Sequence, residues 1–81
     1  MHFVTVEKNQ ASAPSAEDLK KAMILSNGTP GEVTGNNSAR TLTFTGEISH
    51  TTYENKLIEV AKGKRTSWNF TWADANVKST A

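Results

Sequence analysis

The sequence predicts a small α+β domain in which an antiparallel sheet carries two helices on one face. Stretches with period-two alternation and stretches with helical periodicity follow one another in the order strand, helix, short strand, strand, helix, strand. Eighty-one residues, 36% of them hydrophobic, can bury one modest core. We therefore expect a single domain over residues 1–73 and a polar, frayed C-terminal tail over residues 74–81.

The strands are predicted from side chains that alternate between two faces. Residues 2–8 carry apolar side chains on both faces, which indicates a central strand. Residues 32–34 lie between two turn signals and are typical of a short strand in a hairpin. Residues 40–48 alternate most regularly, with Leu, Phe and Ile on one face and Thr and Glu on the other. Residues 65–73 form the predicted last strand.

The helices are predicted from capping residues and apolar stripes. Ser15 is a suitable N-cap for a helix over residues 16–26, which an Asn-Gly pair ends. Thr51 and Glu54 form a capping box that opens the second helix, and Gly63 closes it. This order of elements is that of a split βαβ, or ferredoxin-like (βαββαβ), sandwich.

The strongest signal lies in the last strand, where a basic turn runs into three rings at alternate positions. Trp68, Phe70 and Trp72 share one face of this strand and make up half of the six aromatic residues in the chain. A chain this poor in large apolar side chains needs them in its core. We therefore expect the rings to pack beneath the second helix, which leaves a face of hydroxyl and amide groups on the other side of the sheet.

This polar sheet face is the predicted functional surface. Its contact residues would be Thr41, Thr43, Thr45, Asn69 and Thr71, which offer hydrogen-bonding groups and little charge. We expect a small non-enzymatic protein-binding module, such as a bacterial or phage accessory or inhibitor factor, that acts by occupying the surface of a partner protein. A homodimer formed through an exposed sheet edge would also fit, and a self-assembling structural subunit is an alternative function.

A single-stranded nucleic-acid binder is the other alternative, and it requires exposed rings. Residues 68–72 would then stack bases while Lys62, Lys64 and Arg65 contact phosphates. The same basic turn is also typical of a helix C-terminus, where cations interact favourably with the helix dipole. A formal net charge of +1 provides no long-range attraction for nucleic acid. Protein is therefore the favoured partner.

Enzymatic, metal and membrane functions find no support in the sequence. The chain has no cysteine, and His2 and His50 are far apart with no neighbouring ligand to complete a metal set. We expect no catalytic residue, no metal site and no cofactor. No apolar run approaches the ~20 residues of a membrane-spanning helix, and the N-terminus lacks the layout of a signal peptide, so we expect a cytoplasmic protein without membrane contact.

Overall fold

The computed structural model describes residues 2–9, 12–61 and 68–74 and has an α+β fold. A four-stranded antiparallel sheet is combined with two helices, as the sequence predicted. The elements follow the chain in the order β1 (His2–Glu7), α1 (Ala16–Leu25), β2 (Thr29–Gly35), β3 (Ala39–Thr45), α2 (His50–Val60) and β4 (Asn69–Asp74).

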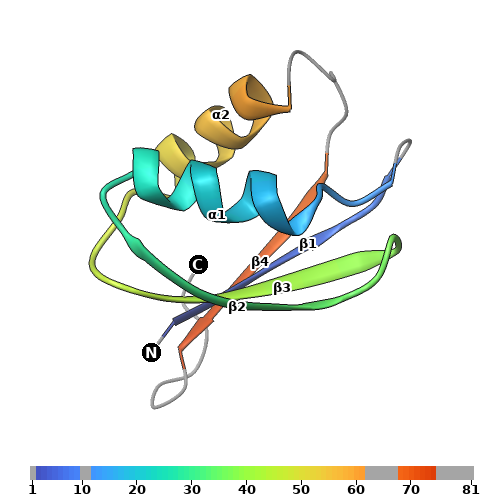
Figure 1. Ribbon diagram of the computed structural model, residues 1–81, viewed down its shortest axis with the longest axis horizontal. Coiled ribbons are helices and arrows are strands. Elements are labelled where there is room, and N and C mark those ends of the chain that lie inside the picture. The colour runs from blue at the N-terminus through green and yellow to red at the C-terminus, as the bar shows by residue number, and fades with distance from the viewer. Residues whose placement is uncertain (1, 10–11, 62–67, 75–81) are drawn as a thin grey trace.

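The strands lie in the order β2-β3-β1-β4, and every neighbouring pair is antiparallel. β1 is therefore a central strand, which agrees with its apolar side chains on both faces. Both helices cover the same face of the sheet (Figure 1). Within residues 2–9, 12–61 and 68–74, no element covers the opposite face.

The core lies between the helices and the sheet. Trp68 and Trp72 are only 6% and 4% exposed, and Phe70 is partly buried against the same cluster, which confirms the prediction that the rings belong to the core. Burying one indole removes roughly 150–250 Å² from water, which is worth about 4–6 kcal/mol. The fully or nearly buried members of the cluster are Val4, Val6, Leu19, Ala22, Met23, Leu42, Phe44, Tyr53, Leu57, Ala61, Trp68 and Trp72.

Trp72 lies at the centre of an aromatic cluster that joins the helical layer to the sheet. The imidazole of His50, in the first turn of α2, stacks parallel to the indole with 3.8 Å between ring centroids. Tyr53 and Phe44 contact the same indole edge-on, at centroid distances of 5.5 and 6.0 Å. The ring of His2 in turn lies 5.2 Å from that of Phe44. These contacts join α2 to β4, and through Phe44 and His2 the cluster extends to β3 and β1.

The capping residues of the first helix were predicted correctly, and that of the second was not. Ser15 caps α1, since its hydroxyl accepts a hydrogen bond from the backbone N–H of Asp18 at 3.2 Å. α2 begins two residues earlier than expected, because its N-cap is Ser49, whose hydroxyl accepts from the backbone N–H of Thr52 at 3.2 Å. The predicted terminator Gly63 lies outside the described residues.

The hairpin between the helices is longer than its turn signals suggested. The predicted strand 32–34 is the middle of β2, which carries a bulge between Pro30 and Val33 where its register with β3 shifts. β3 ends before the predicted Ile48, because Gly46 adopts a φ of 106° and turns the chain. Ile48 nevertheless packs against the core from beyond the strand.

Tyr53 is the single tyrosine of the chain and tests the packing between the two helices. Its hydroxyl donates a hydrogen bond to the carbonyl oxygen of Leu19 at 3.2 Å, and burial raises the pKa of the phenol above its usual value of about 10. The contribution of this buried phenol to the free energy of unfolding is complete below pH ~10. It is lost as the pH rises further, because the phenol then ionises in the unfolded chain but not in the folded protein. We expect an ultraviolet absorbance titration to show no phenolate in the folded protein near pH ~10, where an exposed tyrosine ionises.

The control for this titration is Tyr53→Phe. This variant should lose about 1–2 kcal/mol of stability at neutral pH, through the missing hydrogen bond, and should no longer lose stability through this phenol at alkaline pH. A phenol that ionises at its ordinary pH while the protein remains folded would contradict the packing described above.

Candidate docking surface

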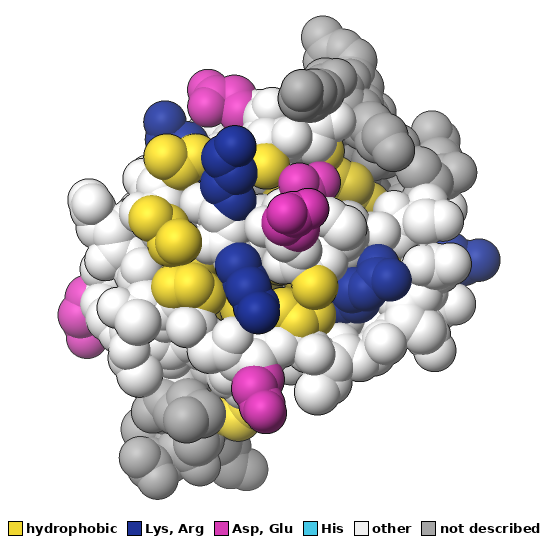
Figure 2. Space-filling view, viewed as in Figure 1, with side chains coloured by type: hydrophobic (Ala, Val, Ile, Leu, Met, Phe, Trp, Pro, Cys, Tyr) yellow, Lys and Arg dark blue, Asp and Glu magenta, His cyan; other side chains and the backbone are white. Residues whose placement is uncertain are grey.

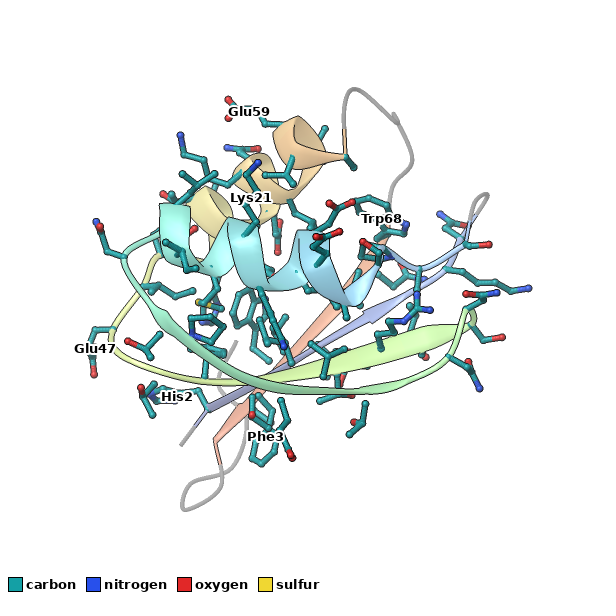
Figure 3. All side chains as sticks on the ribbon, in the orientation of Figure 1. His2, Phe3, Lys21, Glu47, Glu59 and Trp68 are labelled. Carbon is teal, nitrogen blue, oxygen red and sulfur yellow. The ribbon has the colours of Figure 1, made fainter. Side chains whose placement is uncertain are left out.

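The open side of the sheet presents a surface that we call the threonine face. Figure 3 shows Phe3 on this side, opposite the helices, whereas Trp68 lies on the helix side. Strand alternation and register define the members of the face. They are Phe3 and Thr5 of β1, Thr34 of β2, Thr41 and Thr43 of β3, and Thr71 and Ala73 of β4.

Four threonines form a row that crosses the whole sheet. Thr34 is paired with Thr41, Thr41 with Thr5, and Thr5 with Thr71, so that each strand contributes one member. Neighbouring strands are about 4.8 Å apart, and the hydroxyl and methyl groups therefore repeat at about this spacing. The hydroxyls of Thr5 and Thr41 are hydrogen-bonded to each other at 2.9 Å. The row is a regular array of small groups of fixed position.

A second row places an aromatic ring in the middle of the face. Phe3 is paired with Thr43 on one side and with Ala73 on the other, and its ring is partly exposed. The hydroxyl of Thr43 is occupied by β2, because it accepts a hydrogen bond from the backbone N–H of Glu32 at 2.9 Å. Thr43 therefore holds the bulge of β2 in place, while Phe3 supplies the large apolar contact of the face.

The threonine face carries no basic side chain among its described residues. Two carboxylates border it: Glu7 is exposed at the end of β1, and Glu32 is exposed in the β2 bulge, where its backbone N–H donates to the hydroxyl of Thr43. On the side of the molecule seen in Figure 2, Lys and Arg are interspersed with Asp and Glu, and no broad area of one sign is present. A surface of hydroxyls around one ring, bordered by carboxylates and without a basic side chain among the described residues, is suited to a protein partner better than to phosphate groups.

The predicted contact residues share this side of the sheet but form two separate groups, one on β3 and one on β4. Thr41 and Thr43 of β3 are separated from Thr71 of β4 by the central strand β1. Thr45 and Asn69 are exposed at the margins, at the end of β3 and at the start of β4.

Three members of the face were not predicted as contact residues from the sequence: Phe3, Thr5 and Thr34. Alternation in β1 already placed Phe3 and Thr5 opposite Val4 and Val6. Their place between β3 and β4 follows only from the order of the strands.

The other predicted groups contribute no site in the described residues. Lys62, Lys64 and Arg65 lie outside the described part of the chain. His2 and His50 both take part in ring packing, and no group of three or more His, Asp or Glu that could hold a metal occurs in residues 2–9, 12–61 and 68–74. None of the described helices is long and apolar enough to cross a membrane.

Comparisons of the chain with protein-family models, with curated proteins and with solved structures each found no match.

Fluorescence of the two tryptophans tests which face of the sheet is covered. Because both indoles are buried, we expect an emission maximum blue-shifted from that of the denatured chain and weak quenching by acrylamide. The single variants Trp68→Phe and Trp72→Phe assign the signal to each ring. An emission maximum equal to that of the denatured chain, in a protein that is folded by circular dichroism, would mean that the rings are exposed.

Proposed function

We propose that this protein is a small non-enzymatic binding module that occupies the surface of a partner protein through its threonine face. The observation that carries the proposal is the partly exposed Phe3 ring, which lies among small polar side chains on a sheet face with no basic side chain among the described residues. Centres of protein interfaces are enriched in aromatic residues and depleted of charged ones. Phe3 would be the anchor, and the threonines around it would supply hydrogen bonds.

We further propose that the fold is a ferredoxin-like sandwich. The connection through α1 joins β1 to β2, with β3 between them, and the connection through α2 joins β3 to β4, with β1 between them. Two interleaved units of this kind are the split βαβ pattern. The pattern places both helices on one face, so that a binding surface on the other face needs no additional element.

The size of the face supports a weak or transient complex. Four strands about 4.8 Å apart, each of about six residues at 3.4 Å per residue, cover on the order of 400 Å². A standard interface buries about 800 Å² on each partner. An accessory or inhibitor factor of a bacterium or phage would fit this description, because such a factor acts by covering a surface and performs no chemistry itself.

The nucleic-acid alternative is less well supported than protein binding. It requires an exposed stacking platform, and the indoles of Trp68 and Trp72 belong to the core. Association of identical copies, as a homodimer or as a structural subunit, remains a form of the protein-binding proposal in which the partner is a second copy.

Paired substitutions test whether the threonine face is the contact surface. Thr41→Lys and Thr71→Lys each add a charge that must be desolvated on binding, so we expect at least a tenfold loss of affinity, equivalent to about 1.4 kcal/mol. Asn55→Lys is the matched control, because it adds the same charge at an exposed position of α2 on the helix side. The measurement is a pull-down from host lysate with each tagged variant, in which the sets of retained proteins are compared.

The proposal requires that the same proteins be retained by wild type and Asn55→Lys and lost by both face variants, with all four proteins equally folded by circular dichroism. Equal capture by all of them would show that binding uses another surface. Mass measurement in solution separates the self-association form, since a monomer at high micromolar concentration excludes a dimer of useful affinity.

A further inference from the structure

A cavity of about 430 Å³ lies on the helix side of the sheet, away from the threonine face. The segment before α1, the first turn of that helix, the β2–β3 turn, the end of α2 and the residue that leads into β4 meet around it. Its volume is within the range of roughly 300–1,000 Å³ that is usual for small-molecule sites. The cavity belongs neither to the proposed docking surface nor to the aromatic cluster around Trp72.

One wall of the cavity holds a fixed cation, the guanidinium of Arg40. Its Nη1 donates to the carbonyl oxygens of Ala13 and Pro14, at 3.3 and 2.9 Å, and its Nη2 donates to Oδ1 of Asn37 at 3.0 Å. A guanidinium has five N–H donors. Among the residues that the structure describes, the Nε–H and one Nη2–H of Arg40 therefore have no acceptor, and no carboxylate pairs with this charge.

The segment before α1, whose carbonyl oxygens accept from Arg40, is itself hydrogen-bonded to the β2–β3 turn. The backbone N–H of Ala13 donates to the carbonyl oxygen of Asn37 at 2.8 Å. Arg40 is thus oriented by groups that carry no formal charge. Its own charge is left available, and little side-chain entropy remains to be lost when an anion binds.

The same cavity is lined by an anion, the carboxylate of Asp18. The backbone N–H of Asp18 is used by the cap of Ser15, but in the described part of the chain its carboxylate makes neither a hydrogen bond nor an ion pair. Asp18 and Arg40 therefore face one cavity with opposite charges that are not paired with each other.

Part of the remaining lining is apolar. Trp68 contributes its indole, whose N–H donates to the carbonyl oxygen of Ser12 at 3.1 Å, and Pro14 and Ala61 lie on the same cavity. The cavity therefore combines a cation with free donors, an unpaired anion and an apolar surface.

From this combination we propose that the cavity binds a small zwitterion of the α-amino-acid class. The ligand carboxylate accepts from the free N–H groups of Arg40, the ammonium group donates to Asp18, and the ligand side chain lies against Trp68. A planar guanidinium matches a carboxylate well. A simple anion would be repelled by Asp18, and a simple cation by Arg40, so that only a ligand with both charges satisfies both groups. The proposal is independent of the function assigned to the threonine face.

The rival explanation is a direct ion pair between Arg40 and Asp18 that forms in solution by side-chain rotation. Such a pair would occupy the same groups and leave nothing for a ligand. Titration with defined small molecules distinguishes the two explanations.

The experiment follows the indole N–H resonance of Trp68 in two-dimensional ¹H–¹⁵N spectra of the full chain, with Trp68→Phe used for assignment. We expect glycine and phenylalanine, added separately at millimolar concentration, to shift this resonance in a saturable manner. N-acetylglycine carries only the negative charge and ethylamine only the positive charge. Each should bind at least about tenfold more weakly, because each leaves one charged group of the cavity unsatisfied.

Two variants complete the test. Asp18→Asn keeps the backbone N–H that the cap uses, so we expect it to fold and to bind glycine at least about tenfold more weakly. Arg40→Lys keeps the charge but lacks the planar fork and should show a similar loss. Glu17→Gln is the control, because Glu17 is exposed in the same helical turn and does not line the cavity.

Saturable shifts with both amino acids that Asp18→Asn weakens and Glu17→Gln leaves intact would establish the site. The proposal is overturned if neither amino acid shifts the resonance, if N-acetylglycine binds as tightly as glycine, or if Asp18→Asn leaves the affinity unchanged. Thr41→Lys should leave amino-acid binding unchanged, so that failure of the docking surface and failure of this cavity are separate results.

Discussion

The fold depends on the burial of the last strand's indoles beneath the helices. Trp68 and Trp72 are almost completely buried and commit one side of the four-stranded sheet to the helices. Once these rings are fixed, period-two alternation sends Thr71 outward, and the pairing of β4 with β1 sends Thr5 and Phe3 outward with it. The hydroxyl-rich surface is therefore a direct consequence of where the core had to be built.

Most of the architecture could be predicted from local signals. Each helix has a capping residue and a stripe of apolar side chains, and each strand has side chains that alternate between two faces. Such signals involve only a few neighbouring residues. The predicted ends of elements were wrong where contacts between distant residues determine them. α2 begins at His50, whose ring lies on Trp72, and this contact between separate elements leaves no trace in the residues around Ser49. β3 was overextended because Ile48 joins the core from a loop and keeps the strand's apolar pattern without its geometry.

The surface and the cavity were less predictable, since both are formed across the chain. Thr41 and Thr71 could be found from their own strands, but Phe3 becomes their neighbour only because β1 lies between β3 and β4. Arg40 and Asp18 carry no motif. They face one cavity because the segment before α1 is tied to the β2–β3 turn by the hydrogen bond from Ala13 to Asn37, a contact that no residue spacing indicates.

The pairing of β1 with β4 also has a kinetic consequence. The central strand comes from the beginning of the described chain, and one of its two neighbours comes from the end of it. Val4 and Val6 thus gain their second hydrogen-bonding partner only after the ribosome has released nearly all of these residues. Until then the hairpin and helices surround an incomplete sheet, and closure of this long loop has an entropic cost. We therefore expect folding to be slower than that of a domain of similar size whose strands pair only with neighbours in the sequence.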